Sequence, residues 1–238
     1  MKKKIDLVIL CGGRGTRLGN ITKNTPKPLI EINGVPFIEY LINFYQKFDF
    51  KNIYLISHYK ANQFRKKYHL KYFNSMQCHC IAEKKPKDTA GAIFEIKNIV
   101  NNDFLLINGD SYLKYNFKKF MQKKNNNLCN MVLIRNKNYK SNKKLASLNI
   151  AKNKNVFIST KSNLMNSGIY FFKKEFLKLL KNEKISLEHD ILPNLIRKQM
   201  VSGVKVSGFS IDIGLKKNLK YATRNFPKLI EKPNIFKI

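Results

Sequence analysis

The chain has 238 residues and is 43% hydrophobic, which is enough to bury the core of one α/β domain. Its apolar runs all fall short of the roughly 18 residues that a membrane-spanning helix needs, so no membrane partner is expected. The apolar run behind the basic start ends at Cys11, too early for a secretory signal, and a cytoplasmic protein is expected.

The chain is strongly basic, with 46 Lys and Arg against 15 Asp and Glu and a formal net charge of +31. One explanation is a module that binds nucleic acid. The other is drift in composition, because the lysines are spread along the chain instead of being clustered. We favour drift and expect no nucleic-acid partner, although the charge attracts anionic substrates in both cases.

The first half of the chain alternates between strand-like and helix-like patterns. Residues 5–11 form a nearly continuous apolar run that leads into two glycines. This pattern is typical of a buried parallel strand. Further strands are predicted at 52–57, 76–82 and 103–107, with helices at 36–48, 60–72 and 90–100. This order predicts an α/β fold with a parallel sheet, helices on both of its faces and right-handed crossovers.

The second half departs from this alternation, since its first strand-like segments lie close together. They are residues 129–135, 146–150, 156–159 and 168–172, and they suggest a mixed or antiparallel extension of the sheet. Helices are predicted at 173–180, 187–198 and 215–225, a strand at 204–213 and a basic exposed loop at 136–144. We expect one domain over 1–238, with a short tail at 226–238.

Cys78 and Cys80 flank a histidine, and a strand would place both thiols on one face. They could reach one metal ion, but no second ligand pair is evident, and packing of reduced thiols is favoured.

A glycine-rich segment, Leu-Cys-Gly-Gly-Arg-Gly-Thr-Arg-Leu at residues 10–18, follows the first strand. Glycines permit a tight bend, and their bare amides can cradle phosphate oxygens. Arg14 and Arg17 add cations, and Lys27 lies between two prolines that stiffen its backbone. The spacing matches neither a Walker A loop nor a dinucleotide fingerprint.

Two aspartates, about 100 residues apart, are associated with strand-like segments. Asp110 comes after residues 103–107, and Asp212 lies in a second run that ends in glycine. Carboxylates at strand ends suit magnesium, a hard ion that keeps several waters. For either aspartate taken alone a cap or turn residue is the favoured interpretation, but beside the glycine loop we expect both to bind Mg²⁺.

The segment 10–18, followed by Pro-Lys-Pro-Leu at 26–29, resembles the signature of the sugar-1-phosphate nucleotidylyltransferases. The resemblance runs from Ile5 to about Ala222. It implies a Rossmann-like three-layer α/β/α fold with a mostly parallel mixed central sheet. It also implies a nucleotide-binding half at 1–115 and a sugar-binding half at 116–225.

The resemblance further implies site residues in four groups. Arg17, Lys27, Asp110 and Asp212 would be catalytic, with both aspartates ligating Mg²⁺. Residues expected to bind nucleotide are Leu10, Gly12, Gly13, Arg14, Gly15, Thr16, Glu83, Asp88, Thr89, Gly91, Asn108 and Gly109. Residues expected to bind the sugar phosphate are Lys161, Asn166, Gly168 and Glu188.

Three positions depart from the family pattern, the first being Lys87, where the family usually has leucine. Asp88 stands where the family usually has glycine, and it either accepts hydrogen bonds from guanine or caps a helix. The small residues around Gly91 open this helix, whose N-terminus is expected to face the ligand. Thr160 replaces a glutamate before Lys161.

The implied reaction joins a nucleoside monophosphate from a triphosphate to a sugar 1-phosphate and releases pyrophosphate. Within the family, the resemblance is greatest to bacterial D-glycero-D-manno-heptose 1-phosphate guanylyltransferases. GTP is therefore the favoured nucleotide, and GDP-heptose for capsule or lipopolysaccharide is the expected product. Uridylyl-, thymidylyl- and cytidylyltransferases, acting on another sugar 1-phosphate or on phosphocholine, are alternatives. A homodimer is possible.

Overall fold

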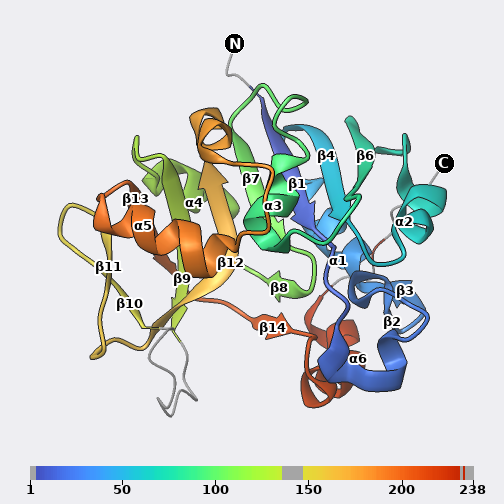
Figure 1. Ribbon diagram of the computed structural model, residues 1–238. Coiled ribbons are helices and arrows are strands. Elements are labelled where there is room, and N and C mark those ends of the chain that lie inside the picture. Colours follow the sequence, from blue (N-terminus) through green and yellow to red (C-terminus); the bar gives the residue numbers. More distant parts are fainter. Residues whose placement is uncertain (1–3, 136–146, 231–232, 234–238) are drawn as a thin grey trace. The chain divides into compact units, whose positions relative to one another are not determined.

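The computed structural model describes residues 4–135, 147–230 and 233 (Figure 1). The predicted loop at 136–144 lies outside these residues. The chain divides into two compact units, each built from separate stretches of sequence. Unit 1 comprises Met1–Pro86, Ile107–Tyr112 and Ser210–Ile238, and unit 2 comprises Lys87–Leu106 and Leu113–Phe209.

Unit 1 is built on parallel strands. β1 (Ile5–Leu10) pairs with β4 (Phe50–Ser57), and β4 pairs with β6 (Met76–Ala82), both in parallel. The end of β7 (Phe104–Asn108) lies beside β1, and β5 (Tyr72–Phe73) runs antiparallel to β6. The residues Leu7 to Ile9 are fully buried, as expected for a strand covered on both faces.

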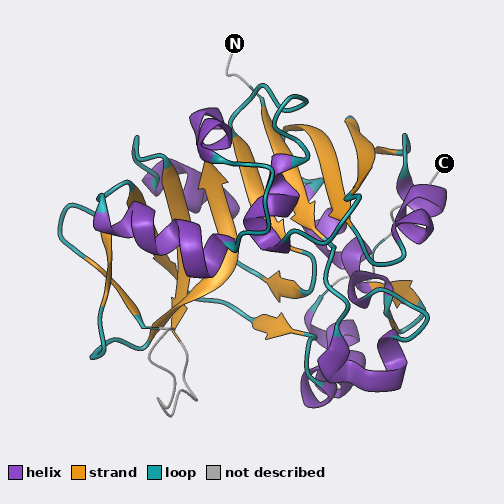
Figure 2. Ribbon diagram, in the orientation of Figure 1, coloured by secondary structure: helices purple, strands orange, loops and turns teal. Residues whose placement is uncertain are grey.

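The helices of unit 1 are α1 (Phe37–Tyr45), α2 (Ala61–Tyr68) and α6 (Lys216–Leu229), and β2 (Glu31–Ile32) and β3 (Val35–Pro36) form a small hairpin. Figure 2 shows these helices in purple. α1 packs against α6 through Tyr40 and Phe226, whose ring centroids are 5.1 Å apart. Because α6 begins four residues after Asp212, this contact helps to anchor the segment that carries Asp212.

Unit 2 confirms the predicted mixed arrangement. Its central strand β9 (Cys129–Arg135) pairs antiparallel with β12 (Leu164–Phe172) and parallel with β13 (Val201–Val206). β10 (Leu148–Ile150) and β11 (Val156–Ile158) form an antiparallel pair, with β10 next to β12. The helices are α3 (Asp88–Phe94), α4 (Phe117–Lys123) and α5 (Leu192–Arg197). Phe172 anchors the core, stacking on Phe104 at 5.6 Å and on Phe176 at 4.0 Å.

Several predicted elements differ from the observed ones. The helix expected over 60–72 ends at Tyr68, since Leu70 has a φ of 61° and the chain then enters β5. The strand expected over 204–213 is two strands, β13 and β14 (Ser210–Asp212), separated at Gly208. A Cβ on Gly208 would lie 1.9 Å from the carbonyl oxygen of Lys114, so the chain turns where another residue would collide.

Two predicted α-helices have other geometry. Residues expected as a helix over 173–180 form a 3₁₀ helix, Lys174–Leu179. The helix expected over 187–198 starts as a π-helical turn, Leu187–Ile191, before α5. Pro193 sits in the first turn of α5, where its missing N–H costs nothing. The sequence did not predict α4, whose N-cap Asn116 accepts the amide of Lys119 at 2.8 Å.

Within the described part of the chain, no helix combines the length and the apolar character that crossing a membrane requires. Cys78 and Cys80 are buried on one face of β6, in agreement with the prediction that their thiols pack in the core. No cluster of three or more His, Cys, Asp or Glu side chains suited to a metal occurs among the described residues.

A buried carboxylate gives a stability test of unit 1. Glu39 in α1 accepts a hydrogen bond from the hydroxyl of the fully buried Tyr68 at 2.8 Å and pairs with Lys67 at 3.0 Å. We expect Tyr68→Phe to lower the free energy of unfolding by about 1–3 kcal/mol, because the carboxylate loses a buried donor. Urea denaturation measures this change. The control Tyr72→Phe, at a position 63% exposed, should leave stability unchanged, and equal effects of the two variants would contradict the prediction.

Candidate functional site

The glycine loop leaves β1 in a shape that its own neighbours enforce. The amide of Cys11 donates to the carbonyl of Ile56 at 2.7 Å, which ties the loop to the end of β4. A Cβ on Gly12 would lie 2.7 Å from Glu83 Oε2, and Gly15 adopts a left-handed φ of 67°. The sequence therefore needs glycine here for both close approach and backbone conformation.

A 3₁₀ helix, Thr16–Thr22, continues the loop. The hydroxyl of Thr22 donates towards the carbonyls of Gly15 and Gly19, at 3.0 and 3.1 Å, and so holds the helix to the loop. Arg14 and Arg17 remain exposed, as do Gly13 and Thr16. The loop thus presents two exposed guanidinium groups on its surface.

Lys27 is held in place by its surroundings. It begins a short 3₁₀ helix, Lys27–Leu29, directly after Pro26, and only 8% of it is exposed. Its ammonium donates to Asp110 Oδ2 at 2.6 Å. The ion pair joins the Pro-Lys-Pro-Leu segment to Asp110, the second residue after β7.

The two aspartates come together through strand pairing. The amide of Gly109 donates to the carbonyl of Leu10 at 2.9 Å, which places Asp110 at the end of the parallel strands, beside the glycine loop. β8 (Ser111–Leu113) then pairs with β14, and the amide of Ile213 donates to the carbonyl of Asp110 at 3.0 Å. Asp212 therefore stands next to Asp110, although about 100 residues separate them in sequence.

The four predicted catalytic residues meet around Gly214. A Cβ at this position would lie 2.8 Å from Asp212 Oδ1, 3.1 Å from Lys27 Nζ and 3.4 Å from Arg17 Nη2. Lys27 in turn contacts Asp110. Two carboxylates and two cations of unit 1 thus occupy one small volume, and glycine is the residue that leaves them room.

The electrostatics of this cluster are uneven. Burial, and next the charge of Asp110, raise the pKa of Asp212 above its ordinary value, against the opposing effects of the Gly214 amide, Lys27 and Arg17. A second negative charge beside Asp110 is therefore costly in the absence of a further cation. Two oxygen-bearing side chains suit a hard divalent ion that completes its shell with water and phosphate.

Tyr59 belongs to this site although the sequence did not indicate it. Its hydroxyl is bonded to the carbonyls of Thr22 and Lys23, at 3.0 and 2.6 Å, and its ring lies 5.7 Å from the guanidinium of Arg14. Tyr59 thereby supports both the 3₁₀ helix and one of the exposed cations. Its place just after β4 is the signal that could have found it, since ligands gather at such strand ends.

Unit 2 brings together a second group of predicted residues. Thr89 contacts Glu188, with 2.5 Å between the hydroxyl and Oε2. Asn166 donates to the hydroxyl of Tyr170 at 2.6 Å and accepts the amide of Gly168, which has a φ of 74°. Burial, and next the charge of Glu188, raise the pKa of Tyr170, so these residues share one environment.

Two amides in the first turn of α3 are already bonded within the protein, contrary to the expectation that they face a ligand. The amides of Ala90 and Gly91 both donate to the carbonyl of Ile185. A Cβ on Gly91 would lie 2.4 Å from the carbonyl oxygen of Glu183, so this glycine serves close packing. Asp88 has a φ of 57°, and Lys87 holds the N-cap position, so the capping alternative for Asp88 is wrong.

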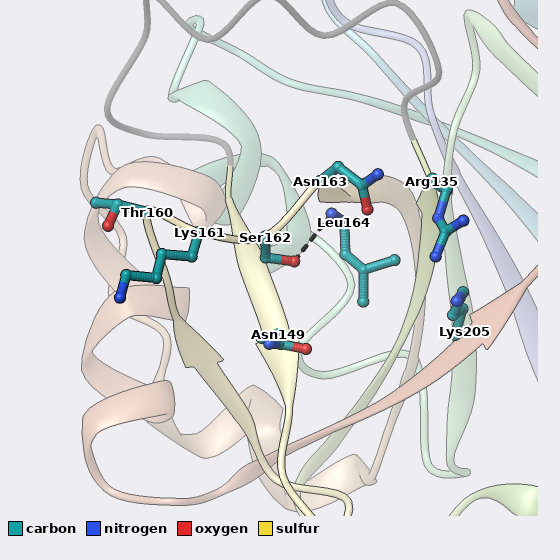
Figure 3. Close-up of a pocket in the computed structure, with 8 residues that line it drawn as sticks. All are labelled: Arg135, Asn149, Thr160, Lys161, Ser162, Asn163, Leu164 and Lys205. Atoms are coloured by element: carbon teal, nitrogen blue, oxygen red, sulfur yellow. Dashed lines mark hydrogen bonds between the residues drawn. The ribbon is translucent and has the colours of Figure 1, made fainter.

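Lys161 lies apart from the other predicted sugar residues. It lines a cavity of about 440 Å³ whose lining includes neither Asn166 nor Glu188. The lining residues are Arg135, Asn149, Thr160, Lys161, Ser162, Asn163, Leu164 and Lys205. Figure 3 shows the side chain of Lys161 extending away from Arg135 and Lys205, so the three cations do not converge.

The sequence matches the family model described as "Nucleotidyl transferase" over residues 7–226. The chain belongs to the nucleotidyl transferase family. Among its curated relatives, "Bifunctional protein GlmU" of Methanocaldococcus jannaschii is 32% identical over 88% of this chain and 51% of its own length. This chain thus spans about half the length of the first relatives it matches.

Another relative of this nucleotidyl transferase matches along nearly its whole length. It is the D-glycero-alpha-D-manno-heptose 1-phosphate guanylyltransferase of Campylobacter jejuni, 31% identical over 87% of this chain and 94% of its own. Among solved structures, HddC from Yersinia pseudotuberculosis has a TM-score of 0.76 at 27% identity, covering 93% and 99% of the two chains. The predicted family and the α/β fold with a mostly parallel mixed sheet are both confirmed.

The two aspartates should respond oppositely to loss of charge. We expect Asp212→Asn to raise the free energy of unfolding of the metal-free protein at neutral pH, because it removes a half-buried charge beside Asp110. Asp110→Asn should lower it, because Lys27 loses its partner in a buried setting. Thermal unfolding with a chelator present measures both.

The pH dependence of stability gives a second test of the raised pKa of Asp212. Folded Asp212 keeps its proton to a higher pH than the unfolded chain does, whose carboxyl titrates near about 3.9. Its contribution to stability is therefore present below that value and is lost as the pH rises through the raised pKa. Asp212→Asn should lack this loss, and a stability profile identical to that of the native protein would contradict the assignment.

Proposed function

We propose that this chain is a sugar-1-phosphate nucleotidylyltransferase, which transfers a nucleoside monophosphate from a triphosphate to a sugar 1-phosphate and releases pyrophosphate. The observation that carries the proposal is the meeting of Arg17, Lys27, Asp110 and Asp212 around Gly214, beside a glycine loop. Family membership supports it.

The chemistry requires little beyond positioning and charge neutralisation. An oxygen of the sugar 1-phosphate attacks the α-phosphorus of the triphosphate, and the bond from that phosphorus to the leaving pyrophosphate breaks. The attacking oxygen is already anionic at neutral pH, so no general base is needed. The obstacle is repulsion between two anions, which preorganised cations reduce.

The residues of unit 1 divide this work among them. The amides of the glycine loop and the exposed Arg14 and Arg17 hold the triphosphate, and Arg17 neutralises the leaving pyrophosphate. Asp110 and Asp212 would hold Mg²⁺, which when bound neutralises phosphate charge. The ammonium of Lys27 pairs with Asp110 in this structure. In the reaction it moves to contact the transferred phosphate.

The residues of unit 2 select the sugar phosphate. Asn166, Gly168 and Glu188 provide hydrogen-bonding groups for sugar hydroxyls. Lys161 lines a cavity that includes none of these residues, so its contact with the phosphate stays a prediction from the sequence. Asp88 is available for base recognition now that it caps no helix. A carboxylate suits guanine, whose N1–H and N2–H₂ are adjacent donors.

The specific substrates we propose are GTP and D-glycero-D-manno-heptose 1-phosphate, giving GDP-heptose for capsule or lipopolysaccharide. The Campylobacter guanylyltransferase supports this choice because the match covers 94% of its length. So does the structure of HddC complexed with GMP-PN, at a TM-score of 0.74 and 27% identity. Uridylyl-, thymidylyl- or cytidylyltransfer is the alternative. A cytoplasmic location and a homodimer stay predictions from the sequence.

A substrate panel tests the function. Each of the nucleoside triphosphates would be incubated with Mg²⁺ and each of several sugar 1-phosphates, and pyrophosphate release measured. We expect turnover, fastest with GTP and the heptose 1-phosphate. Asp110→Ala should lower kcat by at least about 100-fold, since it removes electrostatic stabilisation of the transferred phosphate.

A matched control is Asp49→Ala, which removes an exposed aspartate paired with Lys4 at the surface. It should keep full activity. Absence of turnover with every pair would refute the proposed function. Turnover with a different pair alone would refute the GTP and heptose assignment while leaving the reaction class intact.

A further inference from the structure

The hydroxyl of Thr89, in the first turn of α3, contacts the segment of unit 2 that carries Glu188. Its Oγ1 is 2.5 Å from Glu188 Oε2 and accepts the amide of Leu187 at 2.7 Å. A threonine hydroxyl has one proton to donate. Because that proton goes to the carboxylate, the side chain has none left to donate to a nucleotide.

Glu188 is held on one side only. Its Oε2 takes the hydroxyl of Thr89 and, at 3.4 Å, that of Ser186, which in turn caps the amide of His189. Within residues 4–135, 147–230 and 233, its Oε1 has no hydrogen-bond donor. The side chain is half-buried, so Oε1 is the oxygen available to an incoming hydroxyl.

The backbone around Thr89 is fixed to the same segment that carries Glu188. The amides of Ala90 and Gly91 donate to the carbonyl of Ile185, and the amide of Ile185 donates to the carbonyl of Lys87. Gly91 permits this close packing. Thr89 is thus a support held by reciprocal backbone hydrogen bonds, and a charge-assisted hydrogen bond transmits its position to the carboxylate.

We propose that Thr89 is a positioning residue for sugar recognition: it fixes Oε2 of Glu188 and thereby presents Oε1 as the acceptor for a hydroxyl of the sugar phosphate. The inference rests on the proposed function and assigns to Thr89 a role different from the nucleotide contact expected from the sequence. It makes the start of α3 part of the apparatus that selects the sugar.

The test is Thr89→Val, which keeps the shape of the side chain and removes the hydroxyl. With the best substrate pair of the native protein, we expect the KM for the sugar 1-phosphate to rise about tenfold, the effect of losing one hydrogen bond to a charged group. The KM for the triphosphate should stay within twofold. Thr89→Ser, which keeps the hydroxyl, should restore the native KM.

A double-mutant cycle separates positioning from general damage to the fold. In a Glu188→Ala background, Thr89→Val should cause no further rise in the KM for the sugar phosphate, because the carboxylate it positions is gone. Thermal unfolding checks that each variant is folded. Should Thr89→Val fail to fold, Thr89→Ala carries the same expectations.

The outcomes distinguish this inference from the proposal beneath it. A native protein that turns over no pair refutes the proposed function and the inference with it. An active native protein whose Thr89→Val variant loses affinity chiefly for the triphosphate refutes the inference alone. Additive effects of Thr89→Val and Glu188→Ala on the KM for the sugar phosphate would do the same.

Discussion

The ion pair between Lys27 and Asp110 is the interaction on which the rest of the site depends. It joins a proline-bounded lysine to a carboxylate at the end of a parallel strand, over 2.6 Å. Asp212 lies beside the pair, and burial, followed by the charge of Asp110, raises its pKa although Lys27 and Arg17 oppose the shift. The arrangement therefore favours an additional cation beside the two carboxylates, and it holds the side chain of Lys27 in position for a phosphate.

Much of this site could be predicted because its residues are contiguous or end a recognisable strand. The bend at Gly12 and Gly15, the stiffened Lys27 and the carboxylate after β7 are all local features of sequence. That Asp110 and Asp212 meet follows from the pairing of β8 with β14, three-residue strands too short to show a periodic pattern. Tyr59 escaped notice because an aromatic residue after a strand has many ordinary uses.

The fold shows the same division between what is local and what is not. Strands β6 and β9 were predicted to the residue, because burial on one face of β6 and along most of β9 leaves a clear apolar pattern. The break at Gly208 was missed, because the carbonyl that this glycine approaches closely belongs to Lys114, far away in sequence. The role of Gly91 was misjudged for a similar reason: the packed carbonyl comes from Glu183, so a helix opening that looked suited to a ligand is filled by protein.

The most direct test of the account is a crystal structure of the protein with Mg²⁺ and a non-hydrolysable nucleoside triphosphate. The account predicts the phosphates against residues 12–17, the metal between Asp110 and Asp212, and the ammonium of Lys27 shifted from Asp110 to a phosphate oxygen. Phosphates bound away from that loop, with Lys27 still on Asp110 and no metal at either aspartate, would contradict it.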